Sequence, residues 1–412
     1  MWDALRASSV LSWALRSQRT REVRHGPRED VQLLAAAALA CGSVCAAPAA
    51  VPLVKPERPG FGPGAAFGFK KEKTRRSVSG IACLPVGAQR RCLVVFDEGV
   101  KAQFATLGAA SLEPTDEPFE LIASGKELDA EGAATDGNYF YAIGSHAVKR
   151  KDCESNPASR HLVRFKARWT ASAGAPRLTI ETMQDSQQLW DLMLKDPVLS
   201  RHADGCLGDG DGGRAEQRGR RPGLNIEGIA AQGGRLYVGL RAPVLGNEAL
   251  VYSVDADALF AGGDPTPRLV QLPVGGPWGV RDLSAGRQAI LMLLGPDDRQ
   301  RSGPPQWRVA EWSPSAGGPG RSRPRVLAQL DLSRRNEAPM ELRRAGGSSS
   351  GRRWPTAQGL RSGLSQVRFD TCAEDLKPEA LTILAESVTA YRILVLSDGV
   401  CDGGPLVFDV PR

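Results

Sequence analysis

The sequence predicts an all-β protein with the architecture of a β-propeller, and three observations support this fold class. A six-residue pattern (apolar, polar, any residue, Glu, small, apolar) occurs around Glu131, Glu227 and Glu379, with looser copies around Ser79 and Arg281. Each copy precedes a run of β-forming residues that ends on a polar residue or glycine. In three copies this offset is identical, from Glu131 to Ser145, from Glu227 to Arg241 and from Arg281 to Gly295. A hairpin repeated at fixed spacing is typical of a propeller.

The predicted blades follow one another from residue 78 to the end of the chain. The second strands of the five hairpins are residues 93–97, 141–145, 237–241, 291–295 and 394–398. Two intervals between copies are close to one blade of about 40–50 residues, and the other two are roughly twice as long. We therefore expect insertions at about 170–222 and 333–366, with a short amphipathic helix at 186–197 in the first. A sixth, degenerate blade in the second long interval is the alternative to five.

The last predicted blade is one strand short, because only 33 residues follow Glu379. A closed ring of blades removes exposed sheet edges. We therefore predict that the extended segment 47–77, and within it 66–75, completes the last blade, so that 78–412 forms one propeller domain.

The N-terminal residues 1–46 are interpreted as a leader and a secretory signal peptide. An apolar stretch at 31–44 is followed by small residues, with Val44 and Ala46 at the −3 and −1 positions of a cleavage site. A buried alanine-rich helix is the alternative. The stretch is too short to span a bilayer, so we expect no membrane span and an exported protein, periplasmic or extracellular.

The cysteine content agrees with export. Without residues 1–46, six cysteines remain, and six allow 15 pairings. Proximity in the predicted hairpins favours three pairs: Cys83 with Cys92, Cys153 with Cys206, and Cys372 with Cys401. The formal net charge of +7 comes largely from arginines in Gly-, Ser- and Pro-rich loops that hold few aromatic residues. Nucleic acid is therefore not an expected partner.

The repeated pattern also predicts where a functional site would lie. The first strand of each propeller blade lines the central channel, so the marked residues should converge near the axis with the ends of the second strands around them. The candidate ligand-binding residues are Asp97, Asp129, Glu131, Ser145, His146, Asn225, Glu227, Arg241, Arg281, Asp282, Glu379 and Asp398. Clustered carboxylates raise one another's pKa unless a cation intervenes, which makes such a cluster a site candidate.

Three kinds of chemistry suit these residue types. Oxygen ligands suit Ca²⁺ or Mg²⁺. Carboxylates together with His146 suit general acid–base catalysis, with Glu131, Glu227 and Glu379 as the other catalytic candidates. Arginines suit an anionic ligand. The structural alternative is that Glu–Arg ion pairs only lock blade to blade. The sequence contains no GxSxG, HExxH, Walker or GxGxxG signature for serine hydrolysis, zinc proteolysis or nucleotide binding.

The motifs together resemble a bacterial family known only as domain of unknown function 3616. The resemblance rests on Asp129-Ala130-Glu131-Gly132 with Ile143-Gly144-Ser145-His146, Asn225-Ile226-Glu227-Gly228 with Gly239-Leu240-Arg241-Ala242-Pro243, Arg281-Asp282-Leu283 with Gly295-Pro296, and Pro378-Glu379-Ala380. It covers about residues 78–410 and implies a propeller-like fold with no established activity. The Glu-Gly hairpins are more loosely similar to those of secreted phytase-like esterase propellers.

These observations lead to two functional hypotheses beside the structural or protein-interaction alternative. The first is a binding module that holds a small polar or anionic molecule, with or without a divalent cation, in the mouth of the channel. The second is a phytase-like phosphoester hydrolase that uses the channel carboxylates.

Overall fold

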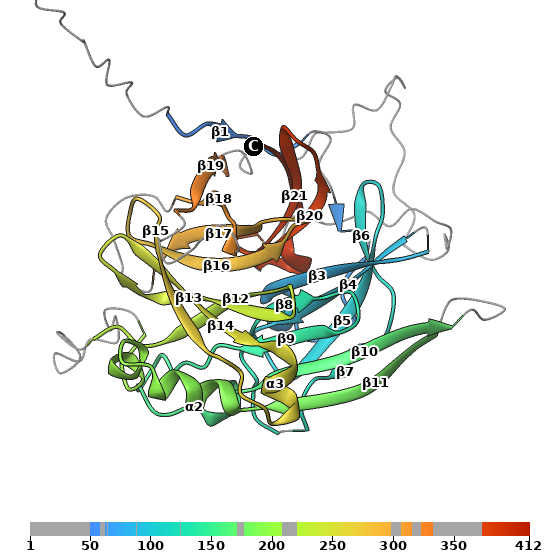
Figure 1. The fold of residues 1–412 in the computed structure, drawn as a ribbon. Coiled ribbons are helices and arrows are strands. Elements are labelled where there is room, and N and C mark those ends of the chain that lie inside the picture. The colour runs from blue at the N-terminus through green and yellow to red at the C-terminus, as the bar shows by residue number, and fades with distance from the viewer. Residues whose placement is uncertain are drawn as a thin grey trace, which may run out of the picture. The chain divides into compact units, whose positions relative to one another are not determined.

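Five hydrogen-bonded sheets form the five blades of a β-propeller (Figure 1). The computed structural model describes residues 50–57, 62–63, 65–87, 89–123, 125–170, 177–207, 221–297, 306–314, 323–332 and 373–412. The all-β propeller predicted from the sequence is confirmed, with five blades in the described residues. The predicted signal peptide and leader and the predicted insertion at 333–366 lie outside the described residues.

Four of the blades contain at least four strands, and the fifth contains three. Blade one consists of β3 (Val78–Val86), β4 (Gln89–Phe96), β5 (Lys101–Leu107) and β6 (Ser111–Pro114), with β7 (Phe119–Glu120) paired to β5. Blade two consists of β8 (Ala130–Thr135), β9 (Phe140–Gly144), β10 (Leu162–Thr170) and β11 (Arg177–Ser186). Blade three consists of β12 (Asn225–Gln232), β13 (Arg235–Leu245), β14 (Glu248–Asp255) and β15 (Arg268–Pro273). Blade four consists of β16 (Trp278–Ala285), β17 (Ile290–Pro296), β18 (Arg308–Trp312) and β19 (Arg325–Leu330), and blade five of β20 (Ala373–Glu386), β21 (Ala390–Val400) and β22 (Leu406–Pro411).

The ring closes between blade five and blade one. The inner strands β3, β8, β12, β16 and β20 contact one another in chain order, and β20 contacts β3 again. A hydrophobic cluster joins the two ends of the ring, with Val78 and Ile81 of blade one packed with Ala380, Leu394 and Val407 of blade five. Because the inner strands meet around one axis, residues at equivalent positions of these strands come together.

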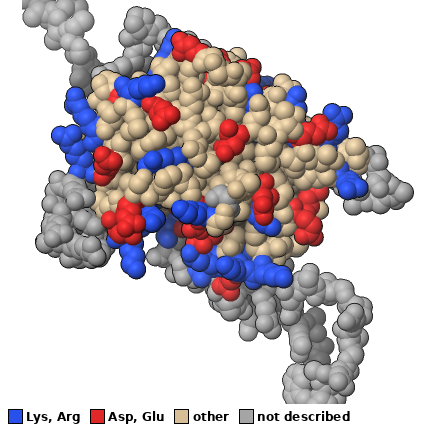
Figure 2. Space-filling view, turned by 90° about the horizontal axis from the view of Figure 1, so that it is seen from below, with Lys and Arg blue, Asp and Glu red and all other residues tan. Residues whose placement is uncertain are grey.

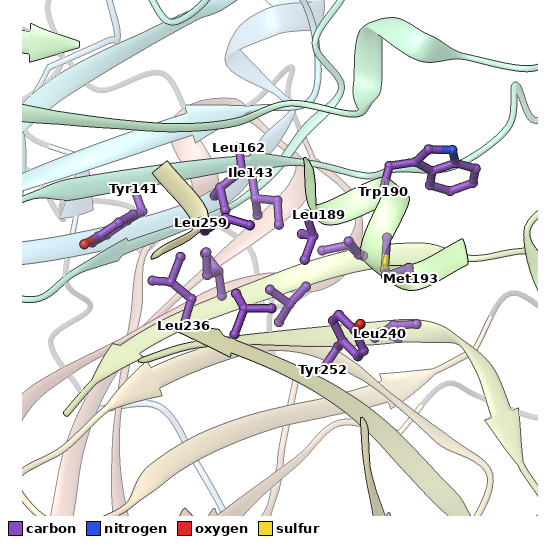
Figure 3. Packing of buried hydrophobic residues seen from close by; sticks show 14 of the residues in the cluster. Tyr141, Ile143, Leu162, Leu189, Trp190, Met193, Leu236, Leu240, Tyr252 and Leu259 are labelled. Carbon is purple, nitrogen blue, oxygen red and sulfur yellow. The ribbon is translucent and has the colours of Figure 1, made fainter. Parts of the chain in front are cut away.

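Helix α2 (Gln188–Lys195) packs on the side of blades two and three, as Figure 3 shows. Leu189 and Met193 are fully buried and lie in one cluster with Leu240 and Tyr252 of blade three. The short helix predicted at 186–197 is therefore confirmed. The predicted insertion at 170–222 began too early, because β11 lies within it and is the outer strand of blade two.

The remaining helical elements of the described residues are short. They are α1 (Glu72–Arg75), α3 (Ala256–Ala261), and the 3₁₀ helices η1 (Pro157–Ser159), η2 (Leu199–His202) and η5 (Cys401–Gly403). Helix α3 begins with a side-chain cap, since the Asp255 carboxylate accepts a hydrogen bond from Ala258 N at 2.8 Å. No helix of the described residues is long and apolar enough to cross a membrane.

The N-terminal segment does not supply the fourth strand of blade five in the way predicted. Two of its short strands pair elsewhere, β1 (Leu53–Val54) with β19 and β2 (Gly62–Pro63) with β6. Residues 66–75 do not form a strand of blade five and include helix α1. The physical reason is the buried carboxylate of Asp402, which accepts hydrogen bonds from Phe67 N and Arg75 Nε, both at 2.9 Å. These bonds hold the segment against the end of blade five.

Two of the predicted disulfides are present, Cys83–Cys92 across the β3–β4 hairpin and Cys153–Cys206. The second connects the loop after β9 to the residues that follow η2, and thereby fixes the helical insertion to blade two. Cys401 is also disulfide-bonded, and Cys372, its predicted partner, lies outside the described residues. On the face shown in Figure 2, acidic and basic side chains are interspersed among uncharged residues.

Candidate functional site

Every inner strand carries a β-bulge at the same position. In each blade the strand register shifts by one residue, so that one residue of the inner strand has no partner on the second strand. The five bulge residues are Ser79, Glu131, Glu227, Arg281 and Glu379, the marked residues of the sequence pattern. A bulge redirects a side chain without ending the strand, and bulges are common beside functional sites. The repeated pattern is therefore the sequence signature of a repeated bulge.

The small residue after each bulge is explained by contact with the next blade. A Cβ atom on Gly228 would lie 2.7 Å from Asp282 Cα and 2.9 Å from Leu283 N, both backbone atoms of blade four. Blade four uses Asp282 at the equivalent position. Its carboxylate accepts hydrogen bonds from Leu283 N at 2.7 Å and, across the blade junction, from Leu381 N at 2.6 Å. The predicted ligand-binding residue Asp282 thus connects blades four and five.

Three of the bulge side chains meet at the axis. One carboxylate oxygen each of Glu131, Glu227 and Glu379 lies within 4.8 Å of the other two. Glu227 and Glu379 are buried, whereas Glu131 remains partly accessible. Ser79 is the bulge residue of blade one. Its hydroxyl donates a hydrogen bond to Ser77 O, two residues earlier in the chain, at 3.1 Å.

Arginines from blades three and four neutralise two of these glutamates. Arg281 is 2% exposed, and its guanidinium lies between Glu227 (Nε to Oε2, 3.2 Å) and Glu379, to which it donates a hydrogen bond. Glu227 also accepts hydrogen bonds from Arg241 at 2.7 Å and from the amide of Asn225 at 3.1 Å. Oε1 of Glu227 is therefore engaged by two protein donors, whereas Oε2 is buried and has only the ion-pair contact with Arg281.

Glu131 differs from the other two glutamates because no described residue donates a hydrogen bond to it or forms an ion pair with it. Burial raises the pKa of Glu131 well above its usual value, and the negative charges of Glu227 and Asp129 raise it further. Burial likewise raises the pKa of Glu379 to about 8, although Arg281 opposes this shift. A carboxylate in this position needs a proton or a cation.

A chain of backbone hydrogen bonds builds the rim above the glutamates. Gly399 N donates to Arg76 O at 2.7 Å, and Asp97 N donates to Ser77 O at 2.9 Å. The second strands of blades five and one therefore end beside each other, because both are bound to consecutive residues of the chain. The rim continues through Leu128 N, Ser145 N and Ile226 N, which donate to Gly99 O, Asp129 O and Ser145 O at 2.9, 2.9 and 2.8 Å. Blades five, one, two and three are joined in this order.

Three aspartates stand on this rim, and each keeps partly accessible surface. Asp129 accepts a hydrogen bond from the Ser145 hydroxyl, and Asp398 lies 3.4 Å from the ammonium group of Lys377. Asp97 has a buried oxygen, Oδ1, with no hydrogen-bond partner among the described residues. Burial raises the pKa of Asp97 to about 8, with a contribution from the negative charges of Asp398 and Asp129. Burial also raises the pKa of Asp129.

Below the glutamates, the inner strands enclose a cavity of about 90 Å³ along the axis. All five blades line it with small side chains, among them Ala82, Ala133, Ala230, Ala285 and Thr382. The cavity begins two to three residues beyond each bulge. The glutamates therefore lie between this narrow cavity and the acidic rim.

His146 lies apart from the carboxylates. The residue is fully buried, Nδ1 lies 2.9 Å from Gly144 O, and the imidazole faces the Trp190 ring at a centroid distance of 6.5 Å. Burial lowers the pKa of His146 to about 4, and the charged groups that act on it are Arg160 and His161. The structure thus places this predicted catalytic candidate among neighbours in blade two and helix α2.

The sequence reasoning missed two features of the site. Lys377 occupies the polar second position of the repeated pattern, as Asp129 and Asn225 do, and this equivalence is the signal that could have identified it. The second feature is Gly295, because a Cβ atom there would lie 2.3 Å from the Trp307 ring and 2.9 Å from Arg281 Cγ. Blade four therefore has glycine instead of a polar residue at the end of its second strand, and this leaves space for the Arg281 side chain.

Comparison with known proteins identifies the family and adds a weak structural likeness. The model of the family described as "Protein of unknown function (DUF3616)" matches residues 100–172 and 161–315, so the chain belongs to this family. No curated protein matches. One similar solved structure is the α-L-arabinofuranosidase PaAbf62A from Podospora anserina, 8% identical, covering 88% of this chain and 97% of that one, with a TM-score of 0.40. Another is MPT-4, a mannose phosphorylase from Leishmania mexicana, 13% identical over 88% of each chain, with a TM-score of 0.34. Likenesses of this strength carry no argument about function.

Proposed function

We propose that this member of the family is an exported binding module that holds a divalent cation at Glu131, Glu227 and Glu379 and binds a small polar molecule at the acidic rim above it. The observation that carries the proposal is the carboxylate of Glu131, which has no partner among the described residues. Export is supported by the disulfides Cys83–Cys92 and Cys153–Cys206, since disulfides persist in oxidising compartments.

The charges in the site support a cation. Six carboxylates, those of Asp97, Asp129, Glu131, Glu227, Glu379 and Asp398, face the cationic side chains of Arg241, Arg281 and Lys377, and Arg150 acts on Asp129 as well. The arginines are already committed to Glu227 and Glu379. A divalent cation next to Glu131 would satisfy its oxygen atoms and lower the pKa values that burial raises. Oxygen-only ligands match the preference of Ca²⁺ and Mg²⁺.

The hydrolase hypothesis receives no comparable support from the described residues. General acid–base catalysis needs groups that reach the same substrate. His146 is buried against Trp190, and none of the three axial glutamates is among the charges that act on it. The site is therefore better explained as a place that holds a ligand.

The proposal is tested by cation binding to the purified chain. We expect Ca²⁺ to raise the melting temperature at neutral pH and to give a saturable isotherm with one ion per chain, because ligands that bind only the folded state stabilise it. The substitution Glu131→Gln keeps the size of the side chain and removes its charge, so it should abolish the shift. Glu117→Gln is the matched control, since Glu117 is exposed and distant in sequence from every bulge.

The expected pattern is loss of the calcium shift in Glu131→Gln and retention of it in Glu117→Gln. If neither Ca²⁺ nor Mg²⁺ changes the melting temperature of the unmodified chain, or if Glu131→Gln responds as strongly as Glu117→Gln, the proposed cation site is wrong. The ion pairs of Arg281 would then serve blade packing alone.

A further inference from the structure

The mouth of the channel is divided into two unlike halves. Blades three and four contribute the guanidinium groups of Arg241 and Arg281, and both are turned inward to the axial glutamates. Blades one, two and five contribute Asp97, Asp129 and Asp398, which are acceptors when ionised. The carboxylates of this half keep accessible surface, as Arg241 does, whereas Arg281 is 2% exposed.

We propose that the molecule bound at this acidic half is an uncharged, hydroxyl-rich compound, a polyol or a monosaccharide, with Asp97 and Asp398 as acceptors for its O–H groups. This inference rests on the proposed cation-binding function and names the class of ligand that accompanies the cation.

The geometry of the rim carries the first step. Asp97 and Asp398 are adjacent because their strand ends bind the neighbouring carbonyls of Ser77 and Arg76. Asp97 Oδ1 has no described partner, and the Lys377 ammonium group lies at 3.4 Å, a long contact, from one oxygen of Asp398. Two neighbouring carboxylates thus offer oxygen atoms that need hydrogen-bond donors. Adjacent hydroxyls on one carbon chain or ring can donate to both carboxylates, and each such bond to a charged acceptor is strong.

The charge of the site carries the second step. At the rim, the carboxylates of Asp97, Asp129 and Asp398 outnumber the cationic side chains that act on them, Lys377 and Arg150, and Glu98 adds further negative charge. An anion would bring more negative charge beside Asp97 and Asp398, where like charges are costly. An uncharged polyol adds none, its hydroxyls donate to the aspartates, and its oxygens can reach the cation.

The position of the cationic side chains carries the third step. Arg281 is buried between two glutamates, and Arg241 donates from Nη1 to Glu227 at 2.7 Å, so both guanidinium groups are already paired with carboxylates. Arginine recognises carboxylate or phosphate through an accessible planar fork. An anionic ligand would therefore compete with Glu227 and Glu379 for these guanidinium groups.

The inference is tested by calorimetric titration of the calcium-saturated chain with four probes. myo-Inositol and D-glucose represent the uncharged class, sulfate the anions and putrescine the amines. We expect binding of at least one uncharged probe and none of sulfate. Asp398→Ala should weaken that binding by about tenfold or more, because it removes a charged hydrogen-bond acceptor. Its calcium affinity should fall by less than its affinity for the uncharged probe, because Asp398 acts on Glu379 through its charge and is not one of the three axial ligands.

Asp409→Ala is the matched control, an exposed aspartate in the same blade, and should leave both affinities unchanged. Asp97→Asn serves as a second rim variant should Asp398→Ala fail to fold. If calcium binds but neither uncharged probe does, or if sulfate or putrescine binds instead, the ligand class is wrong while the cation site stands. If calcium itself does not bind, the proposed cation-binding function is wrong, and the inference about the ligand class that rests on it is wrong as well.

Discussion

Blades two and four have the same backbone at the channel and opposite charges on it. Both inner strands carry the bulge, between Ala130 and Gly132 in one and between Val280 and Asp282 in the other. In blade two the bulge residue is Glu131, which has no described partner, and in blade four it is Arg281, which is bound to two glutamates. The backbone bulge is therefore a shared feature of the repeated blades, whereas the side chain at the bulge differs between blades and determines the charge at the channel.

The residues at the ends of the second strands differ between these two blades as well, and each suits the bulge residue of its own blade. Blade two ends its second strand at Ser145, whose hydroxyl donates to Asp129 on the rim. Blade four has Gly295 there, and the space is filled by Trp307 and by the side chain of Arg281, with the guanidinium 5.3 Å from the indole ring. Blade four thus supplies a fixed internal cation, and blade two supplies the open acidic position.

Removing the internal cation should have the largest effect. Arg281→Gln leaves Glu227 and Glu379 buried without their shared counter-charge. Breaking a buried ion pair by removal of one partner costs about 3–5 kcal/mol of folding stability. We expect a loss in this range from urea unfolding at neutral pH.

Arg325→Gln is the control for this prediction. Arg325 also pairs with a glutamate, Glu311, but 56% of its side chain is exposed. Exposed pairs contribute about 0–1 kcal/mol, so this variant should be close to the unmodified chain. Equal stability of the two variants would mean that Arg281 is not the counter-charge of the site.

The shared backbone is tested by a smaller change. Gly228→Ala adds a methyl group 2.7 Å from Asp282 Cα, and backbone on both sides must move to admit it. Overpacking of this kind costs about 1–3 kcal/mol. Gly125→Ala is the control, because a Cβ atom at Gly125 has no neighbour within 4 Å. If both substitutions are neutral in urea unfolding, the small residue after the bulge is not required for contact between blades.

The ring of blades could be predicted from the sequence because the bulge residue and the small residue after it repeat. This repetition located Glu131, Glu227, Arg281 and Glu379 on one axis without knowledge of the fold. The positions of the second strands were also predicted, since β13 and β21 include the runs expected at 237–241 and 394–398, although both strands extend beyond these runs at each end.

Other parts of the structure depend on contacts that no local pattern encodes. The position of residues 66–75 is determined by hydrogen bonds from Phe67 and Arg75 to Asp402, more than 300 residues away. His146 follows Ser145 directly, yet its backbone has a positive φ of 53° and its side chain is buried beside Trp190. The contacts of His146 are therefore set by tertiary packing, which the repeated pattern does not encode.

The smallest expected effect concerns the open position in blade two. The pKa of Glu131 is raised in the folded chain, so the folded state holds this proton more tightly than the unfolded state does. Stability from this group is complete below the unfolded pKa of about 4.5 and is lost as the pH rises toward the raised folded value. Glu131→Gln, which cannot ionise, should therefore melt at a higher temperature than the unmodified chain at pH 8 without added cation. At pH 4 the two should coincide, and Ca²⁺ at pH 8 should remove or reverse the difference. If Glu131→Gln and the unmodified chain melt at the same temperature at both pH values, Glu131 carries no uncompensated charge. Blade two would then need a bound cation no more than blade four does.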